Sequence, residues 1–177
     1  MIPKILITGP PRSGKSTLIS KLINYFLLEK KYSIHGFLTP EVRNQGERIG
    51  FDIQDINSKE KRELARVGTY STKFKLGKYS IFLEGLEKII QNIESTPLDE
   101  INLMIIDEIG KMELFSKKFA DFINQIFSTN LSIFATIGLK LKHPIKDHLL
   151  NLPNVKLFVL ERVNFQKTYQ DIISMVK

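Results

Sequence analysis

The segment at residues 9–16, GPPRSGKS, is the feature that most restricts how this chain can fold. It matches the pattern G-x-x-x-x-G-K-[ST] in full, and it lies between an apolar stretch at residues 4–8 and an amphipathic stretch at residues 15–28. With ordinary amino-acid usage, a chance match in a chain of this length arises on the order of once in a hundred. The segment therefore predicts a strand, a phosphate-binding loop and a helix in direct succession.

Each part of this loop has a chemical task. The glycines let backbone N–H groups converge on phosphate oxygens, and the N-terminus of the following helix adds a partial positive charge. We expect Lys15 to reach the β- and γ-phosphates of a nucleoside triphosphate as a catalytic cation, and the Ser16 hydroxyl to ligate Mg²⁺. All eight residues are candidate nucleotide contacts: Gly9, Pro10, Pro11, Arg12, Ser13, Gly14, Lys15 and Ser16.

A second segment, LMIIDEIG at residues 103–110, has the pattern of an apolar strand that ends in two carboxylates. Beside a phosphate loop, the strand-end Asp107 is expected to hold Mg²⁺, usually through water. Glu108 is a candidate catalytic base, because a second carboxylate next to the metal can polarise a water towards the γ-phosphorus. An ordinary surface glutamate is the alternative. We assign the whole segment to nucleotide binding: Leu103, Met104, Ile105, Ile106, Asp107, Glu108, Ile109 and Gly110.

The tetrapeptide DEIG at residues 107–110 also satisfies the D-x-x-G pattern of GTPase switch regions. No N-K-x-D sequence follows to select guanine, and the serine- and glycine-rich signature of transporter ATPases is missing as well. The sequence therefore predicts a triphosphate site without predicting which base it prefers.

Strand-sized apolar stretches alternate along the chain with stretches of helical periodicity. This alternation predicts a three-layer α/β/α fold around a mostly parallel sheet, in a single domain that spans residues 1–177. Residues 41–53 interrupt it, because residues 44–46 have turn chemistry and alternating apolar side chains follow them. We expect an inserted β-hairpin there.

Charge and composition restrict the function further. The formal charge of +7 is spread along the chain beside acidic residues, so it predicts a solvated, lysine-rich surface and leaves a nucleic-acid partner unsupported. The chain has no cysteine and its three histidines are scattered, so we expect neither a disulfide nor a thiolate or histidine metal site. No apolar run approaches the roughly 20 residues of a membrane helix. We expect a cytoplasmic protein without a membrane partner.

Two longer strings, GFLTPEVRNQGERIGFDI at residues 36–53 and IDEIGKMEL at residues 106–114, resemble the THEP-type nucleoside triphosphatases, which include a cancer-related human relative. The resemblance extends through RVG at residues 66–68 and GKY at residues 77–79, and it covers nearly the whole chain. It implies a RecA-like phosphate-loop fold. It also implies slow, Mg²⁺-dependent hydrolysis of ATP, GTP, CTP and UTP to the diphosphate and phosphate.

The resemblance also indicates three candidate catalytic cations. Arg43 and Arg48 match family arginines in the pattern EVRxxGxRxGF, and a guanidinium placed on transition-state charge is worth about 10³ to 10⁵ in rate. Cross-strand pairing with Glu41 or Glu47 is the alternative for both. Lys111 lies just past the strand-end carboxylates and is the third candidate. A solvated loop lysine is its alternative.

One stretch departs from the family pattern. Many relatives carry T-x-x-N-R after the last strand, whereas this chain has ERVNF at residues 161–165. Asn164 is kept, Phe165 fits the apolar stripe of the last helix, and Arg162 is the candidate to replace the lost charge. The departure affects the expected base contacts and leaves the phosphate chemistry untouched.

Two other functions use similar motifs. A nucleotide or nucleoside kinase also carries a phosphate loop on a domain of this size, but no arginine-rich lid segment is evident in this sequence. A nucleotide-switched module that binds RNA is the other alternative. Stimulation of hydrolysis by polynucleotide, with a steep salt dependence, would identify it.

Overall fold

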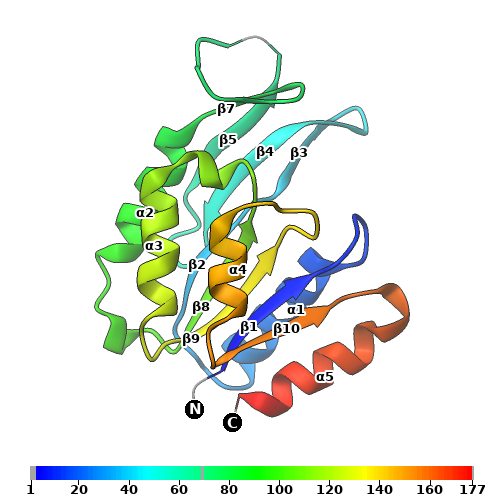
Figure 1. Ribbon diagram of the computed structural model, residues 1–177, viewed down its shortest axis with the longest axis vertical. Coiled ribbons are helices and arrows are strands. Elements are labelled where there is room, and N and C mark those ends of the chain that lie inside the picture. The colour runs from blue at the N-terminus through cyan, green and yellow to red at the C-terminus, as the bar shows by residue number, and fades with distance from the viewer. Residues whose placement is uncertain (1–2, 69, 177) are drawn as a thin grey trace.

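One mixed sheet of ten strands forms the centre of the computed structural model, which describes residues 3–68 and 70–176 (Figure 1). The strands are β1 (Lys4–Thr8), β2 (Ile34–Leu38), β3 (Glu41–Asn44), β4 (Glu47–Asp55), β5 (Lys61–Val67), β6 (Lys75–Leu76), β7 (Tyr79–Ile81), β8 (Leu103–Ile109), β9 (Ser132–Ile137) and β10 (Val155–Val159). They pair in the order β10-β1-β9-β8-β2-β4-β5-β7-β6, and β3 pairs with β4 outside this path.

The strands from β10 to β2 form a parallel block. Their side chains are apolar on both faces of the sheet. In β1, for example, Leu6 belongs to one core cluster while Ile5 and Ile7 belong to the other. Because successive side chains of a strand point to opposite faces, such strands need helices on both sides. The parallel block therefore accounts for the continuous apolar runs in the sequence.

Helices cover both faces of this block (Figure 1). Helices α1 (Lys15–Leu28) and α5 (Phe165–Met175) lie together on one face, and α2 (Leu83–Glu94), α3 (Lys117–Phe127) and α4 (Pro144–Leu150) lie on the other. Short 3-10 turns lie at η1 (Leu98–Glu100), η2 (Glu113–Phe115) and η3 (Arg162–Asn164). The predicted three-layer α/β/α fold is confirmed. Within the described residues, no helix is both long and apolar enough to cross a membrane.

The predicted hairpin is present as β3 and β4, and it is part of a larger antiparallel extension of the sheet. Strand β4 pairs with β2, and β5, β7 and β6 continue outward from it. Sequence patterns do not predict β5, because its charged residues 61–63 precede only two buried side chains, Leu64 and Ala65. Helix α4 is not predicted either, since a segment of seven residues is too short to show the helical period of apolar side chains.

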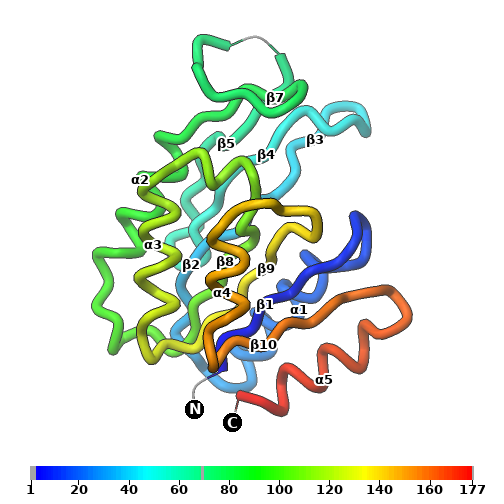
Figure 2. The backbone as a smooth tube through the Cα atoms, in the orientation of Figure 1, coloured from blue at the N-terminus to red at the C-terminus, as the bar shows by residue number. Residues whose placement is uncertain are grey.

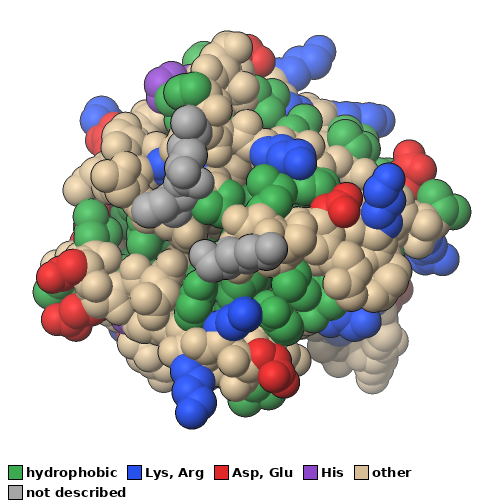
Figure 3. Space-filling model, turned by 90° about the horizontal axis from the view of Figure 1, so that it is seen from below, with side chains coloured by type: hydrophobic (Ala, Val, Ile, Leu, Met, Phe, Trp, Pro, Cys, Tyr) green, Lys and Arg blue, Asp and Glu red, His purple; other side chains and the backbone are tan. Residues whose placement is uncertain are grey.

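The topology brings the functional motifs to one edge of the sheet. Strands β1, β9 and β8 are parallel neighbours, so their carboxyl ends meet, with β9 between the other two. The phosphate loop, the turn between β3 and β4 and the loop after β9 lie on the same side of the molecule (Figure 2). The opposite end of the molecule, where β1 begins and α5 ends, carries basic side chains scattered among apolar and acidic ones (Figure 3).

Candidate active site

The phosphate loop joins β1 to α1. The N-cap of α1 is Gly14 in a left-handed conformation (φ 101°), which glycine adopts without steric penalty. Lys15 Nζ donates hydrogen bonds to the carbonyl oxygens of Gly9 (3.0 Å) and Pro10 (3.3 Å), so its charge lies within the curve of the loop. The first turn of α1 carries no acidic side chain. The positive end of the helix therefore faces the loop without a competing anion.

A cleft of about 1640 Å³ opens above this loop. The loop residues other than Pro10 line it, together with the end of β8, the β3–β4 hairpin and the loop after β9. Small-molecule pockets usually occupy roughly 300–1,000 Å³. The cleft therefore has room for a nucleotide together with a metal ion and water.

Asp107 is held near the end of β8 by both neighbouring strands. Thr136 Oγ1 on β9 donates a hydrogen bond of 2.5 Å to Asp107 Oδ1, and Thr39 Oγ1, just after β2, donates one of 2.7 Å to the Asp107 carbonyl oxygen. Burial raises the pKa of the Asp107 carboxyl, while the Thr136 hydrogen bond, the charge of Lys15 and the Ser16 hydroxyl lower that pKa. Asp107 thus lies within electrostatic reach of the phosphate loop.

Glu108 extends into the same cleft. A Cβ added to Gly110 would lie 3.0 Å from Glu108 Oε1, and one added to Gly138 would lie 3.9 Å from it, so the carboxylate lies between these two glycines. Burial and then the charge of Asp107 raise the pKa of Glu108, and the charge of Lys15 lowers it. A carboxylate with a raised pKa that faces a cleft is suited to accept a proton from water.

The other side chains of β8 have a different role from the one predicted. Only Asp107, Glu108 and Gly110 of residues 103–110 line the cleft. The remaining side chains have no exposed surface, because helices cover both faces of the sheet. We therefore reassign these residues from nucleotide binding to the core: Leu103, Met104, Ile105, Ile106 and Ile109.

Both hairpin arginines line the cleft, and both bind Glu41. Arg43 Nη2 lies 2.6 Å from Glu41 Oε2, Arg48 Nη1 lies 2.8 Å from Glu41 Oε1, and Arg48 Nε also donates to the Tyr79 hydroxyl at 3.1 Å. The hydrogen bond from Arg48 is the largest influence that lowers the pKa of Glu41. The cross-strand pairing expected as an alternative is therefore present for Arg48, whereas Arg43 pairs with Glu41 within its own strand, and neither arginine pairs with Glu47.

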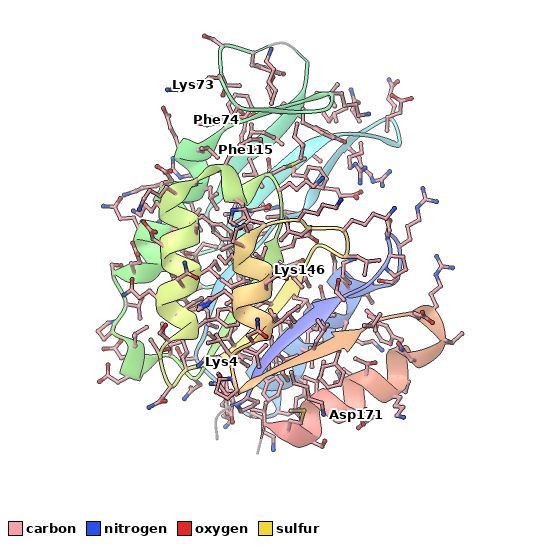
Figure 4. The ribbon with its side chains drawn as sticks, in the orientation of Figure 1. Lys4, Lys73, Phe74, Phe115, Lys146 and Asp171 are labelled. Carbon is pink, nitrogen blue, oxygen red and sulfur yellow. The ribbon has the colours of Figure 1, made fainter. Side chains whose placement is uncertain are left out.

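Two lysines act on the rim of the cleft in different ways. Lys111 is exposed and lines the cleft just past Gly110. Lys146 on α4 lies outside it and fixes the loop after β9, since its Nζ donates to the carbonyl oxygens of Gly138 (3.2 Å) and Leu139 (2.8 Å) (Figure 4). One lysine adds positive charge to the site, and the other holds part of its wall in place.

The stretch that departs from the family pattern lies beside the phosphate loop. Arg162 Nε donates to the Arg12 carbonyl oxygen at 3.3 Å. Asn164 is bonded at both ends of its amide in a turn, because Oδ1 accepts from the Glu161 N–H (2.9 Å) and Nδ2 donates to the Val159 carbonyl oxygen (3.0 Å). Asn164 and Arg162 therefore fix backbone, and neither lines the cleft.

Three further residues of the site were not singled out by the sequence motifs. Thr39 and Thr136 hold Asp107 from either side. Glu113 lines the cleft from η2, and burial raises its pKa to about 8. A single threonine has no special pattern, so only the fold identifies Thr39 and Thr136. Glu113 lies within the string IDEIGKMEL, which was the one available signal for it.

Comparisons with known proteins agree with this fold. A family model described as NTPase matches residues 4–173. The nucleoside-triphosphatase THEP1 of Archaeoglobus fulgidus is 34% identical over 98% of this chain and 99% of its own length. The crystal structure of THEP1 from the hyperthermophile Aquifex aeolicus aligns with a TM-score of 0.83 at 33% identity, covering 98% of this chain and 99% of that one. The solution structure of a human cancer-related nucleoside triphosphatase aligns with a TM-score of 0.78 at 33% identity, covering 99% and 97%. The chain therefore belongs to the NTPase family.

Proposed function

We propose that this protein hydrolyses nucleoside triphosphates, including ATP, GTP, CTP and UTP, to the diphosphate and inorganic phosphate in the presence of Mg²⁺. The place of Glu108 carries the proposal. Its carboxylate shares one cleft with Lys15 and Ser16 of the phosphate loop, and the charge of Asp107 acts on it. A base that faces bound phosphates can direct water at them, which makes water the acceptor of the phosphoryl group.

The available side chains suit Mg²⁺. In residues 3–68 and 70–176, no three His, Asp or Glu side chains converge to form a protein cage for a metal. Mg²⁺ keeps several waters and takes phosphate oxygens, so it needs few protein ligands. Ser16 and Asp107 would hold the ion, which would neutralise charge on the β- and γ-phosphates.

The phosphate loop also contains a polar atom that a phosphate could satisfy. Ser13 Oγ is buried, and within the described chain it is the only buried side-chain oxygen or nitrogen that lacks a hydrogen-bond partner. Buried hydroxyls are normally bonded, because an unpaired polar group away from water costs free energy. Ser13 lines the cleft, so a hydrogen bond to a phosphate oxygen would remove this cost when nucleotide binds.

In the proposed reaction, the water oxygen forms a bond to the γ-phosphorus while the bond to the bridging β,γ-oxygen breaks. The bridging oxygen leaves with the diphosphate and keeps the electron pair, and Glu108 accepts the proton of the attacking water. Lys15 and the loop N–H groups bind the phosphate oxygens. We expect slow turnover, because Arg43 and Arg48 are bound to Glu41 and must leave it before either can act on a phosphate.

Broad use of bases is supported by the turn beside the phosphate loop. Asn164 is bonded to backbone through both ends of its amide and does not line the cleft, so it is not placed to read a base edge. Strong discrimination between similar ligands needs a side chain that hydrogen-bonds the group in which they differ. We therefore expect the four nucleotides to be hydrolysed at comparable rates.

Phosphate release from each of the four nucleotides tests the proposal. The wild type should release phosphate from all four. Glu108→Gln should bind nucleotide with unchanged affinity and lose about 10²- to 10⁴-fold in turnover. Glu47→Gln is the matched control, because Glu47 lines the same cleft on the hairpin, and its turnover should stay near that of the wild type. Hydrolysis by Glu108→Gln at the wild-type rate would contradict the assignment.

The same assay separates hydrolysis from phosphoryl transfer to a nucleoside. Adding nucleosides and nucleoside monophosphates should leave the yield of free phosphate per triphosphate consumed unchanged. Triphosphate consumption that rises while free phosphate falls would instead identify a kinase.

A further inference from the structure

Glu113 is a buried carboxyl group in the cleft that the proposed hydrolysis leaves without a task. Only 4% of its surface is exposed, although it lines the cleft. Its pKa is raised to about 8: burial is the largest cause, backbone hydrogen bonds lower the pKa, and the charges of Glu108 and Asp107 raise it. The group is therefore protonated at neutral pH and can donate a hydrogen bond.

The Glu113 and Glu108 carboxyl groups converge on Gly110. A Cβ added to Gly110 would lie 2.7 Å from Glu113 Oε2 and 3.0 Å from Glu108 Oε1. The first distance is shorter than real Cβ atoms show and the second is a tight contact, so a larger residue at Gly110 would push against both carboxyl groups. Glycine at this position allows the two acidic side chains to approach each other.

The segment that carries Glu113 is fixed at both ends. The Leu114 N–H donates to the Gly110 carbonyl oxygen at 3.1 Å, and the Ser116 N–H donates to the Glu113 carbonyl oxygen at 3.0 Å. The ring of Phe115 packs against that of Phe74, with centroids 5.7 Å apart (Figure 4). These contacts hold Glu113 in place relative to the end of β8.

We propose that Glu113 is a positioning residue for Glu108: its carboxyl proton is donated to the Glu108 carboxylate and holds it in the orientation that accepts a proton from water. The inference rests on the proposed role of Glu108 as the base. A neutral Glu113 orients its neighbour without adding negative charge beside a triphosphate. Two neighbouring carboxyl groups with separated pKa values commonly divide such roles in enzymes.

Other charged groups near Glu113 are few. Its 3-10 turn packs against β8, α2 and α3. From β8, the acidic groups that act on it are Glu108 and Asp107. The charged groups of α2 and α3 nearest in sequence to the contact are exposed or bound elsewhere: Glu84 and Lys88 are exposed, Glu87 accepts from Ser116, Lys117 pairs with Asp121, and Lys118 pairs with Glu94.

The test is the pH dependence of ATP hydrolysis by the wild type, Glu113→Gln and Glu113→Leu. The wild-type kcat should fall above about pH 8, where Glu113 loses its proton. Glu113→Gln has an amide that donates at every pH, so it should keep kcat near the wild-type value at pH 7 and lose this alkaline fall. Glu113→Leu should lose about 10- to 100-fold in kcat at pH 7 with little change in KM, because it removes a hydrogen bond to a charged group.

An alkaline fall in Glu113→Gln identical to that of the wild type would overturn the proposal. So would a folded Glu113→Leu variant with the wild-type kcat. If Glu113→Leu does not fold, the Glu113→Gln profile decides. An infrared band of a protonated carboxyl at pH 7, present in the wild type and lost in Glu113→Gln, is the expected signature, and its absence from the wild type would also overturn the proposal.

Glu108→Gln, run in parallel, separates the two proposals. Unchanged turnover in Glu108→Gln would contradict the proposed function itself, because that function assigns Glu108 as the base. Lost turnover in Glu108→Gln with none lost in Glu113→Leu would remove only the positioning role. Glu84→Gln, an exposed glutamate on α2, is the matched control and should leave the pH profile unchanged.

Discussion

Thr136 Oγ1 donates a hydrogen bond of 2.5 Å to Asp107 Oδ1, and both side chains are buried. Thr136 belongs to β9, the strand that separates β1 from β8. The strand between the phosphate loop and the acidic strand therefore orients the carboxylate that faces the loop. A hydrogen bond to a charged acceptor is worth about 1.5–3 kcal/mol.

Thr136→Val should raise the Mg²⁺ concentration needed for half-maximal hydrolysis by about tenfold or more, because it removes this hydrogen bond without changing the side-chain shape. Titrating Mg²⁺ at fixed nucleotide measures the effect, and Thr136→Ser should restore the wild-type value. The control is Thr8→Val, which removes a buried hydroxyl bonded to the Ile137 carbonyl oxygen (2.9 Å) rather than to Asp107. An unchanged Mg²⁺ requirement in Thr136→Val would count against a metal role for Asp107.

The two hairpin arginines should differ in what their removal changes. Arg48 is bound by Glu41 and Tyr79, and its guanidinium lies over the Phe51 ring at 5.2 Å. We expect Arg48→Ala to lower the free energy of unfolding by about 1 kcal/mol with little change in kcat. Arg43 has no aromatic contact among the described residues and is more exposed (54% against 44%), so Arg43→Ala should chiefly lower kcat. Urea unfolding and steady-state kinetics of both variants measure these effects. A loss of kcat in Arg48→Ala and a loss of stability alone in Arg43→Ala would contradict the prediction.

Lys111→Ala should raise the KM for ATP, because Lys111 contributes positive charge to the cleft. A charge pair in water at contact is worth about 1 kcal/mol, which corresponds to roughly fivefold in KM. The difference from the wild type should shrink as ionic strength rises. Lys117→Ala is the control, since Lys117 is exposed, pairs with Asp121 and lies outside the cleft. Equal KM values for Lys111→Ala and the wild type at low salt would show that Lys111 is a solvated loop residue.

Glu113 should make the protein less stable as pH rises. Its folded pKa of about 8 lies above its ordinary value of 4.5, so between these pH values the folded state binds a proton that the unfolded state has released. Stability therefore falls through this window, by on the order of 5 kcal/mol in total. Urea unfolding at pH 5 and pH 8 should show that the free energy of unfolding of Glu113→Gln rises relative to that of the wild type at the higher pH. Parallel changes in both proteins would refute the assignment of a neutral Glu113.

Short-range patterns predicted the parts of the fold that depend on them. The glycines and Lys15 of the phosphate loop and the apolar runs of β1 and β8 are all local in sequence. Each of them depends on local backbone geometry or on the periodicity of apolar side chains, and the structure has them where they were expected.

Short-range patterns could not predict which residues lie opposite one another across the sheet. A register shift between Val42 and Arg43 places Arg43 opposite Arg48. Two like charges in that position repel each other unless an anion lies between them. Glu41 supplies that anion and binds both. Likewise, Thr136 reaches Asp107 only because the strand order puts β9 beside β8, and strand order leaves no trace in the local sequence.

The two walls of the cleft belong to one continuous sheet. The parallel block supplies the phosphate loop and Glu108, the antiparallel extension supplies Arg43 and Arg48, and the seam where β2 meets β4 joins them. That seam has two paired positions, whereas β8 and β2 pair at five. The seam is the only strand pair of the described residues that joins the two walls, so the way β4 is held against β2 sets how far the arginines lie from the phosphate loop.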